Sequence, residues 1–294
     1  MKPYKWRNCP SVGGIVHGGG MTWSLLFCLI ASATLLSGCK ESTSPDDGSV
    51  KAAYVHTRAS WAPDGRTIAF RGEFNGVTGI CLVDSSGANR RLLLAGEGVG
   101  FTWSPDSRWL AFSAAGTLYK IRVNGDSLTQ LTSSTHDIRP AWSPYGIQIA
   151  FVRTGVWLLR MDSLSTRELS TSGNFPSWHP KGLEVVVMDA GQQMPDLLFP
   201  YSIDAVNTAT GGWRSLYSFG SPDNCGFGSI SSDGNRYVFA VQPNQGLSQV
   251  WEVDLATLTS TRLTEDGADY PAWSPDGVTI VYTRTAEGDG FHAG

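Results

Sequence analysis

The sequence predicts an all-β protein, a six-bladed β-propeller with four antiparallel strands in each blade. The first observation is a five-residue phrase, Trp-Ser-Pro-Asp-Gly in its fullest form, that recurs along the chain. The second is its spacing: successive copies begin 36 to 52 residues apart, and a strand-rich repeat of about 40 residues is typical of propeller blades. The six lead residues are Trp61, Trp103, Trp142, Trp178, Ile230 and Trp273.

Each phrase marks the turn between the first and second strands of a blade. Ser can bond the backbone, Pro presets φ, and Gly relieves crowding at the end of a tight turn. Period-two alternation follows, as in Ile68 and Phe70 or Ile149 and Phe151. That pattern predicts a second strand with its apolar side against a neighbouring sheet.

Third and fourth strands follow in most repeats. The third is expected at residues 79–84, 119–123, 156–160 and 250–254, and the fourth at 90–94, 129–132, 166–170 and 261–264. The fourth repeat carries an insertion at residues 190–200. The sixth has only twelve residues after Tyr282, so we expect an N-terminal strand, residues 51–57, to complete the last blade and close the ring.

The N-terminus has the pattern of an export signal. Three basic residues precede an uncharged stretch from Asn8 to Gly38, whose apolar part spans Met21 to Leu36. Leu36-Ser37-Gly38-Cys39 then resembles the bacterial lipoprotein box, in which the Cys is lipidated and becomes the first mature residue. A simple cleaved signal and an uncleaved membrane anchor remain alternatives. Met21 is a possible start, but it would discard every positive charge of the signal, so Met1 is preferred.

This organisation divides the chain into a signal at residues 1–38, a flexible tether at 39–50 and a propeller at 51–294. The whole chain has a net charge of −4, and without residues 1–38, which carry three basic and no acidic residues, the charge is −7. No basic stripe is present, which argues against nucleic acid as a partner. The two cysteines of the propeller, Cys81 and Cys225, fall in different blades, which favours free thiols over a disulfide.

The repeats resemble those of the TolB family of WD40-like (PD40) propellers, on the Trp-Ser-Pro-Asp-Gly phrase and the Ile-Ala-Phe strand that follows it. The likeness covers about residues 50–294. TolB carries an α/β domain before its propeller and works with the Tol-Pal system at the outer membrane. This chain has a lipid box in place of that domain. The resemblance therefore implies a TolB-like propeller lipoprotein and leaves its partner open.

Candidate catalytic groups are sparse. The fourth position of the phrase holds an Asp in four repeats but Tyr145 and Lys181 in the others, which indicates a turn residue. The lead tryptophans are interpreted as wedges between blades, because they recur at one structural position. The histidines show no metal-ligand spacing, and no phosphate loop or Gly-x-Ser-x-Gly elbow is present. No cofactor or metal is predicted.

One ring of residues is a candidate binding site. The residues three positions before each lead residue should surround one mouth of the central channel, and aromatic and arginine side chains there suit capture of a peptide segment or an anionic group. The alternative is that they only pack between blades. The ring comprises Arg58, Gly100, Arg139, Phe175, Phe227 and Tyr270, with the acids Asp137 and Asp269 beside it.

The function expected from the sequence is that of a lipid-anchored, monomeric cell-envelope protein that binds or scaffolds an envelope protein or peptide. The alternative is a periplasmic propeller enzyme, a lyase or a lactonase, that uses a channel metal on a carbohydrate or small molecule. Convergent histidines and carboxylates at the mouth would favour the enzyme.

Overall fold

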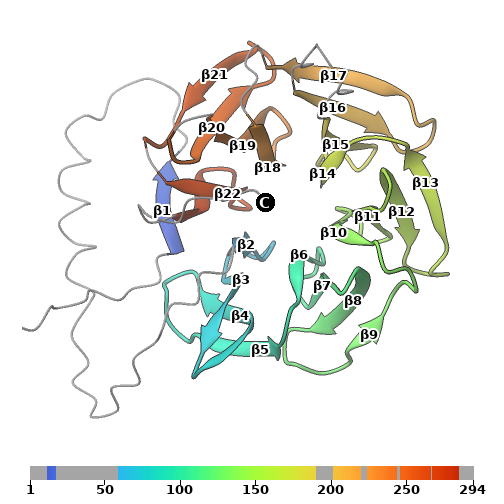
Figure 1. Ribbon diagram of the computed structural model, residues 1–294, viewed down its shortest axis with the longest axis vertical. Coiled ribbons are helices and arrows are strands. Elements are labelled where there is room, and N and C mark those ends of the chain that lie inside the picture. Colours follow the sequence, from blue (N-terminus) through green and yellow to red (C-terminus); the bar gives the residue numbers. More distant parts are fainter. Residues whose placement is uncertain are drawn as a thin grey trace, which may run out of the picture.

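The computed structural model describes residues 12–17, 59–189, 201–219, 224–243, 246–265 and 267–284. These residues form five four-stranded sheets and one three-stranded sheet. Figure 1 shows the six sheets arranged around a central axis, each with one strand nearest that axis. The predicted propeller of four-stranded antiparallel blades is therefore confirmed for five blades.

The strands follow the order expected from the repeats. The innermost are β2 Ala59–Trp61, β6 Val99–Trp103, β10 Ile138–Trp142, β14 Asn174–Trp178, β18 Asn224–Ile230 and β22 Ala268–Trp273. The second strands are β3 Thr67–Phe74, β7 Trp109–Ala114, β11 Gln148–Val152, β15 Glu184–Asp189, β19 Arg236–Gln242 and β23 Thr279–Arg284. The third are β4 Val77–Asp84, β8 Thr117–Arg122, β12 Val156–Arg160, β16 Ser202–Asn207 and β20 Gln249–Asp254. The outermost are β5 Arg91–Ala95, β9 Thr129–Gln130, β13 Thr166–Ser170, β17 Trp213–Ser218 and β21 Thr259–Arg262.

The sixth sheet contains a strand from an unexpected part of the chain. Its order is β1-β23-β22, and β1 spans Val12–His17. β1 runs antiparallel to β23, with the backbone of Ile15 opposite Val281 (Figure 1). The sequence pattern instead predicts that these residues belong to the export signal and that residues 51–57 complete this blade. Residues 51–57, the tether at 39–50, Cys39 and the insertion at 190–200 lie outside the described residues.

The recurrent phrase forms the expected turns. In the second copy the backbone N–H of Ser107 donates to the carbonyl of Ser104, and the hydroxyl of Ser104 donates to Asp106 over 2.5 Å. Asp106 also accepts the backbone N–H of Arg108 over 3.1 Å. Asp64, Asp233 and Asp276 accept the corresponding N–H two residues later. These aspartates therefore stabilise the turn by hydrogen bonds. This role agrees with the presence of Tyr and Lys at the same position of two other repeats.

The lead tryptophans pack against the sheet of the preceding blade. Trp103 lies in a cluster with Leu82 and Leu93 of the first blade, and Trp178 in one with Val156 and Leu158 of the third. The side chains of Trp103, Trp178 and Trp273 are buried, whereas Trp61 and Trp142 are half-buried. The wedge interpretation is confirmed.

Hydrogen bonds at the inner strands link successive blades. At two seams the indole N–H of a lead Trp donates to a backbone carbonyl of the preceding blade. Trp103 donates to Ser60 and Trp178 to Ala141, and each acceptor stands directly before the lead residue of its own blade. At three seams a hydroxyl at that position accepts the backbone N–H of the next lead residue. These acceptors are Thr102, Ser177 and Ser229, and their donors are Trp142, Ile230 and Trp273.

The seam between the sixth and first blades is bonded differently. The residue before the lead Trp273 is Ala272, which has no hydroxyl group. The indole nitrogen of Trp61 is buried and has no hydrogen-bond partner among the described residues. Apolar packing joins the two sheets instead, because Val281 and Ala272 belong to one cluster with Ala59 and Phe70. Among the described residues, burial of apolar side chains therefore joins this seam.

Two further expectations concern the cysteines and the membrane. Cys81 is a buried free thiol, as expected, and burial raises its pKa; Cys225, in another blade, is also buried. Within the residues that the structure describes, no helix has the length and apolar character needed to cross a membrane.

Candidate functional site: the central channel and its mouth

The inner strands enclose a cavity of about 490 Å³ on the propeller axis. It extends from Phe227 and Tyr270, near the middle of β18 and β22, to Pro63, Pro105 and Pro144 in the turns that follow inner strands. Its lining consists of proline rings, aromatic rings, hydroxyl groups and backbone, contributed by all six inner strands or their turns. Such a surface suits an uncharged, extended segment of chain better than a charged small molecule.

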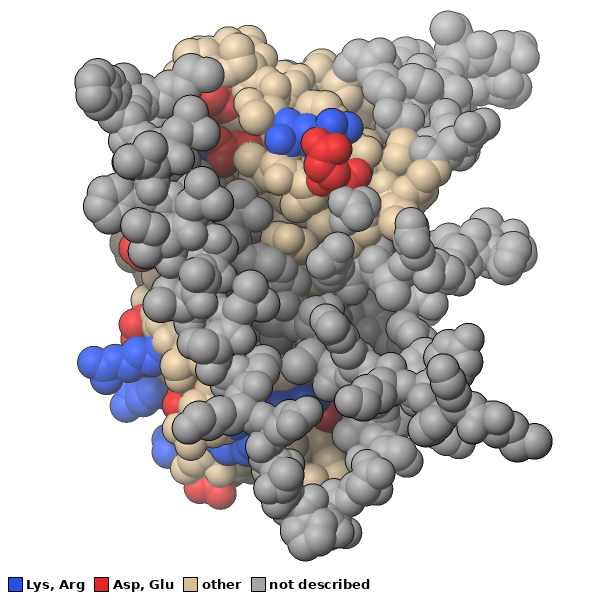
Figure 2. All heavy atoms as spheres, turned by 90° about the vertical axis from the view of Figure 1, so that its left-hand side faces the viewer, with Lys and Arg blue, Asp and Glu red and all other residues tan. Residues whose placement is uncertain are grey.

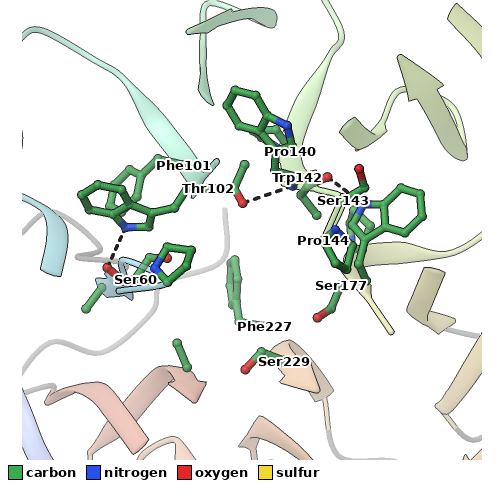
Figure 3. Close-up of a pocket in the computed structure, with 18 of the residues that line it drawn as sticks. Ser60, Phe101, Thr102, Pro140, Trp142, Ser143, Pro144, Ser177, Phe227 and Ser229 are labelled. Atoms are coloured by element: carbon green, nitrogen blue, oxygen red, sulfur yellow. Dashed lines mark hydrogen bonds between the residues drawn. The ribbon is translucent and has the colours of Figure 1, made fainter. Parts of the chain in front are cut away.

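Hydroxyl groups surround this cavity at one repeat position, the residue before each lead residue. Figure 3 shows Ser60, Thr102, Ser177 and Ser229 around the cavity, with Phe227 among them. The hydroxyls of Thr102, Ser177 and Ser229 each accept a backbone N–H from the next blade. Because a hydroxyl also carries a hydrogen, each can still donate to a carbonyl oxygen of a ligand.

The predicted ring of mouth residues has an unusual backbone. Gly100, Arg139, Phe175, Phe227 and Tyr270 all have positive φ values, between 38° and 58°. The register of each of these inner strands shifts at this place, which marks a β-bulge. A bulge redirects the side chain that it carries. Arg58, the sixth member of the ring, lies outside the described residues.

The redirected side chains meet one another at the mouth. The ring centroids of Phe175 and Phe227 are 4.5 Å apart, and those of Phe227 and Tyr270 are 4.0 Å apart. The guanidinium carbon of Arg139 lies 4.2 Å from the centroid of Phe175. Four blades thus contribute one continuous stack, which we call the mouth cap. Of the members of this cap, Phe227 and Tyr270 line the cavity.

Arg139 is the cationic end of the mouth cap. Its side chain is half-buried, and its Nη1 donates to Asn174 Oδ1 over 2.5 Å. The same oxygen accepts the backbone N–H of Phe175 over 2.9 Å, so the acceptor is itself held in place. Burial lowers the pKa of Arg139, against a smaller opposite effect of Tyr270. The group nevertheless stays protonated at neutral pH, because arginine is deprotonated only above about pH 12.

The two acids predicted beside the mouth have different surroundings. Asp137 is fully buried, and its carboxylate binds Arg153 through two hydrogen bonds of 2.7 and 3.0 Å. This pairing raises the pKa of Arg153 and occupies the carboxylate of Asp137. Asp269 accepts the backbone N–H of Tyr270 over 2.8 Å. Both acids therefore support the local structure.

The hydroxyl residues of the channel were missed as candidates by the sequence analysis. A signal was present, because the position before the lead residue holds Ser or Thr in four repeats and Ala in the other two, Ala141 and Ala272. On the face seen in Figure 2, basic and acidic side chains of the described residues lie in small groups of mixed charge. Among the described residues, no three histidine, cysteine or acidic side chains gather as a metal site would require.

Comparison with known proteins supports the fold. No family model matches the chain. An uncharacterized protein of Agrobacterium fabrum is 33% identical over 99 residues, which amount to 31% of this chain and 34% of that protein. The chain thus matches about a third of the length of this curated relative.

Solved propellers are similar over most of the described chain. A putative TolB from Agrobacterium tumefaciens has a TM-score of 0.65 at 19% identity, covering 78% of this chain and 90% of that one. TolB from Acinetobacter baumannii has a TM-score of 0.61 at 15% identity, covering 77% and 62%. An oligogalacturonate lyase in complex with manganese has a TM-score of 0.54 at 15% identity, covering 78% and 90%. At these identities the likeness concerns the fold alone, and for the fold the TolB-like resemblance is confirmed.

Proposed function

We propose that this chain is a lipid-anchored protein of the bacterial cell envelope whose propeller binds an extended peptide segment of a partner protein in its central channel. The observation that carries the proposal is the cavity of about 490 Å³, lined by prolines, aromatic rings and hydroxyls. Aromatic and proline rings offer apolar contact with little loss of side-chain entropy, and the hydroxyls offer hydrogen bonds to peptide carbonyls. The role is binding or scaffolding rather than catalysis.

The location rests on the N-terminal sequence. Leu36-Ser37-Gly38-Cys39 follows an apolar stretch, and lipidation needs the thiol of Cys39 at the cleavage point. Replacement of Cys39 by Ser should therefore release the protein from membranes and abolish labelling by radioactive palmitate. Equal labelling of the wild type and the variant would overturn the lipoprotein assignment.

The shape completes the proposal. We infer a six-bladed ring whose last blade is completed by an N-terminal strand. The pairing of β1 with β23 supports this inference, because it indicates that the edge of β23 accepts an antiparallel strand. Apolar contacts of Val281 and Ala272 with Ala59 bring the sixth sheet against the first.

Site-specific photo-crosslinking in intact cells tests the channel function. A photoreactive side chain at Pro63, which is exposed and lines the cavity, should capture a partner. The same group at Thr261, which is exposed on the outermost strand β21, serves as the control. A partner captured equally from both positions, or from Thr261 alone, would remove the channel from the proposal.

A second candidate is a lyase acting on an acidic carbohydrate, and it is favoured only by the fold shared with oligogalacturonate lyase. That structure contains manganese, which is bound by oxygen and nitrogen ligands in proteins. The channel lining offers hydroxyls and backbone, and the described residues hold no group of three metal-binding side chains. The residues of this channel therefore do not fit that metal, and binding is the better proposal.

A further inference from the structure

Arg139 has surroundings that fit an anionic ligand. Its guanidinium carbon lies 4.2 Å from the ring centroid of Phe175 and 5.6 Å from that of Phe227, and its Nη1 donates to Asn174. Guanidinium carries five N–H donors in a planar fork. Among the described residues, one hydrogen bond uses one of these donors, so further donors can bind a ligand.

The charge of Arg139 is not balanced by the described part of the chain. None of the ion pairs between described residues includes Arg139. The buried acid two positions earlier, Asp137, is bound by Arg153. A partly desolvated cation without a counter-charge costs free energy, and an incoming anion recovers part of this cost.

One ring position next to Arg139 carries no side chain. The ring position that precedes Arg139, one blade earlier, is Gly100, where a Cβ atom would lie only 3.4 Å from the Cα of Arg139. A side chain at that position would therefore contact the backbone of Arg139. Phe175, Phe227 and Tyr270 fill the equivalent positions of the following three blades. Aromatic side chains therefore follow Arg139 around the mouth, and the position before it, Gly100, has no side chain.

We infer that Arg139 binds a carboxylate group of the ligand at the channel mouth. The inference rests on the proposed peptide-binding function and names the group that would anchor the peptide. Carboxylates match the guanidinium fork with two parallel hydrogen bonds, which gives both affinity and orientation. The carboxylate can be the C-terminus of the peptide or the side chain of an Asp or Glu.

The site can be tested on the full chain with acetate as the probe. In protein labelled with ¹⁵N-arginine, acetate should shift the side-chain N–H signal of Arg139 in a saturable way, whereas uncharged acetamide should not. The signal is assigned by its loss in Arg139→Gln. Arg153 serves as an internal control, because Asp137 already occupies its donors. Shifts at Arg139 that are no larger than those at Arg153, or equal shifts with acetamide, would overturn the inference.

Immobilised random decapeptides then separate this inference from the proposed function. One library without Asp or Glu has free C-termini, a second is the same but amidated, and a third is amidated and contains Asp and Glu. Wild-type protein should bind the first or third library about tenfold better than the second, and Arg139→Gln should lose this difference. Preference for the first identifies the C-terminus, and preference for the third identifies side chains.

The remaining outcomes are also decisive. Equal binding to all three libraries, unchanged by Arg139→Gln, would keep the peptide-binding function and overturn the role of Arg139. Absence of binding to any library, together with a saturable acetate shift at Arg139, would keep the carboxylate site and overturn peptide binding.

Discussion

The indole N–H of Trp178 donates to the backbone carbonyl of Ala141 over 2.9 Å, and this bond joins the innermost strands of two successive blades. Trp178 is also packed into the apolar face of the preceding blade, beside Val156 and Leu158. One side chain thus contributes both a directional bond and a large buried surface to the seam. The two contributions can be separated by substitution.

Truncation of Trp178 should destabilise the protein strongly. Trp178→Ala leaves a cavity between blades and should lower the free energy of unfolding by about 3–5 kcal/mol. Trp178→Phe keeps most of the packing and loses the hydrogen bond, with an expected cost of about 1–2 kcal/mol. Leu128→Ala is the control, because Leu128 is 54% exposed. Equal unfolding midpoints in urea for the three variants would contradict the wedge role.

A hydroxyl at the sixth seam should stabilise the ring. Ala272 occupies the position at which Thr102, Ser177 and Ser229 accept an N–H from the next blade. Ala272→Ser should add the missing bond to the backbone N–H of Trp61 and raise stability by about 1 kcal/mol. Ser229→Ala should lose the same amount at the fifth seam. A lower melting temperature for Ala272→Ser would show that the sixth seam has a different geometry.

The turn of the fifth blade should contribute a pH-dependent stability. Hydrogen bonds from the Ser231 hydroxyl and the Asn235 backbone lower the pKa of Asp233. Because the folded-state pKa lies below the unfolded value of about 3.9, the contribution is complete above that pH and is lost as the pH falls through the folded-state pKa. Asp233→Asn should therefore be less stable than wild type at pH 7, within about 1 kcal/mol, and equally stable in acid.

Ser231→Ala is the matched control for this prediction. It removes the largest cause of the lowered pKa and leaves the carboxylate in place. The contribution of Asp233 should therefore be smaller in this variant, and its loss in acid should end at a higher pH than in wild type. Urea unfolding between pH 7 and pH 3 measures all three proteins, and a wild-type advantage over Asp233→Asn that grows in acid would reverse the assigned sign.

The repeats allowed most of the fold to be predicted, because each strand pair is encoded locally by a turn phrase and an alternating strand. The mouth was predicted only in part. The sequence correctly brought Arg139, Phe175, Phe227 and Tyr270 to one place. It could not show the β-bulges, because one shifted residue changes the direction of a side chain without changing the apolar pattern.

Pairings between distant residues were also beyond the sequence. Asp137 and Arg153 lie sixteen positions apart, and neither spacing nor composition marks them as partners. β1 was missed for another reason. Its residues, Val12–His17, stand in the segment that has the composition of an export signal, so their pairing with β23 competes with removal of that segment.

Cleavage before Cys39 would remove β1 and leave the edge of β23 without this strand. An unpaired edge exposes N–H and C=O groups and invites association with other chains. We therefore expect residues 51–57, the strand-like segment that follows the tether, to occupy that edge in the mature protein. Deletion of residues 40–49 should then change the melting temperature little, whereas deletion of residues 50–57 should lower it strongly.

Both deletions are compared in a chain that begins at Cys39 with Cys39 replaced by Ser, so that lipid does not complicate the measurement. Size-exclusion chromatography provides a second measure, because an uncovered β23 edge should produce dimers or larger species only when residues 50–57 are absent. Equal melting temperatures and equal monomer fractions for the two deletions would show that residues 51–57 do not close the last blade. Restoration of stability by adding back residues 1–38 would then assign that place to β1.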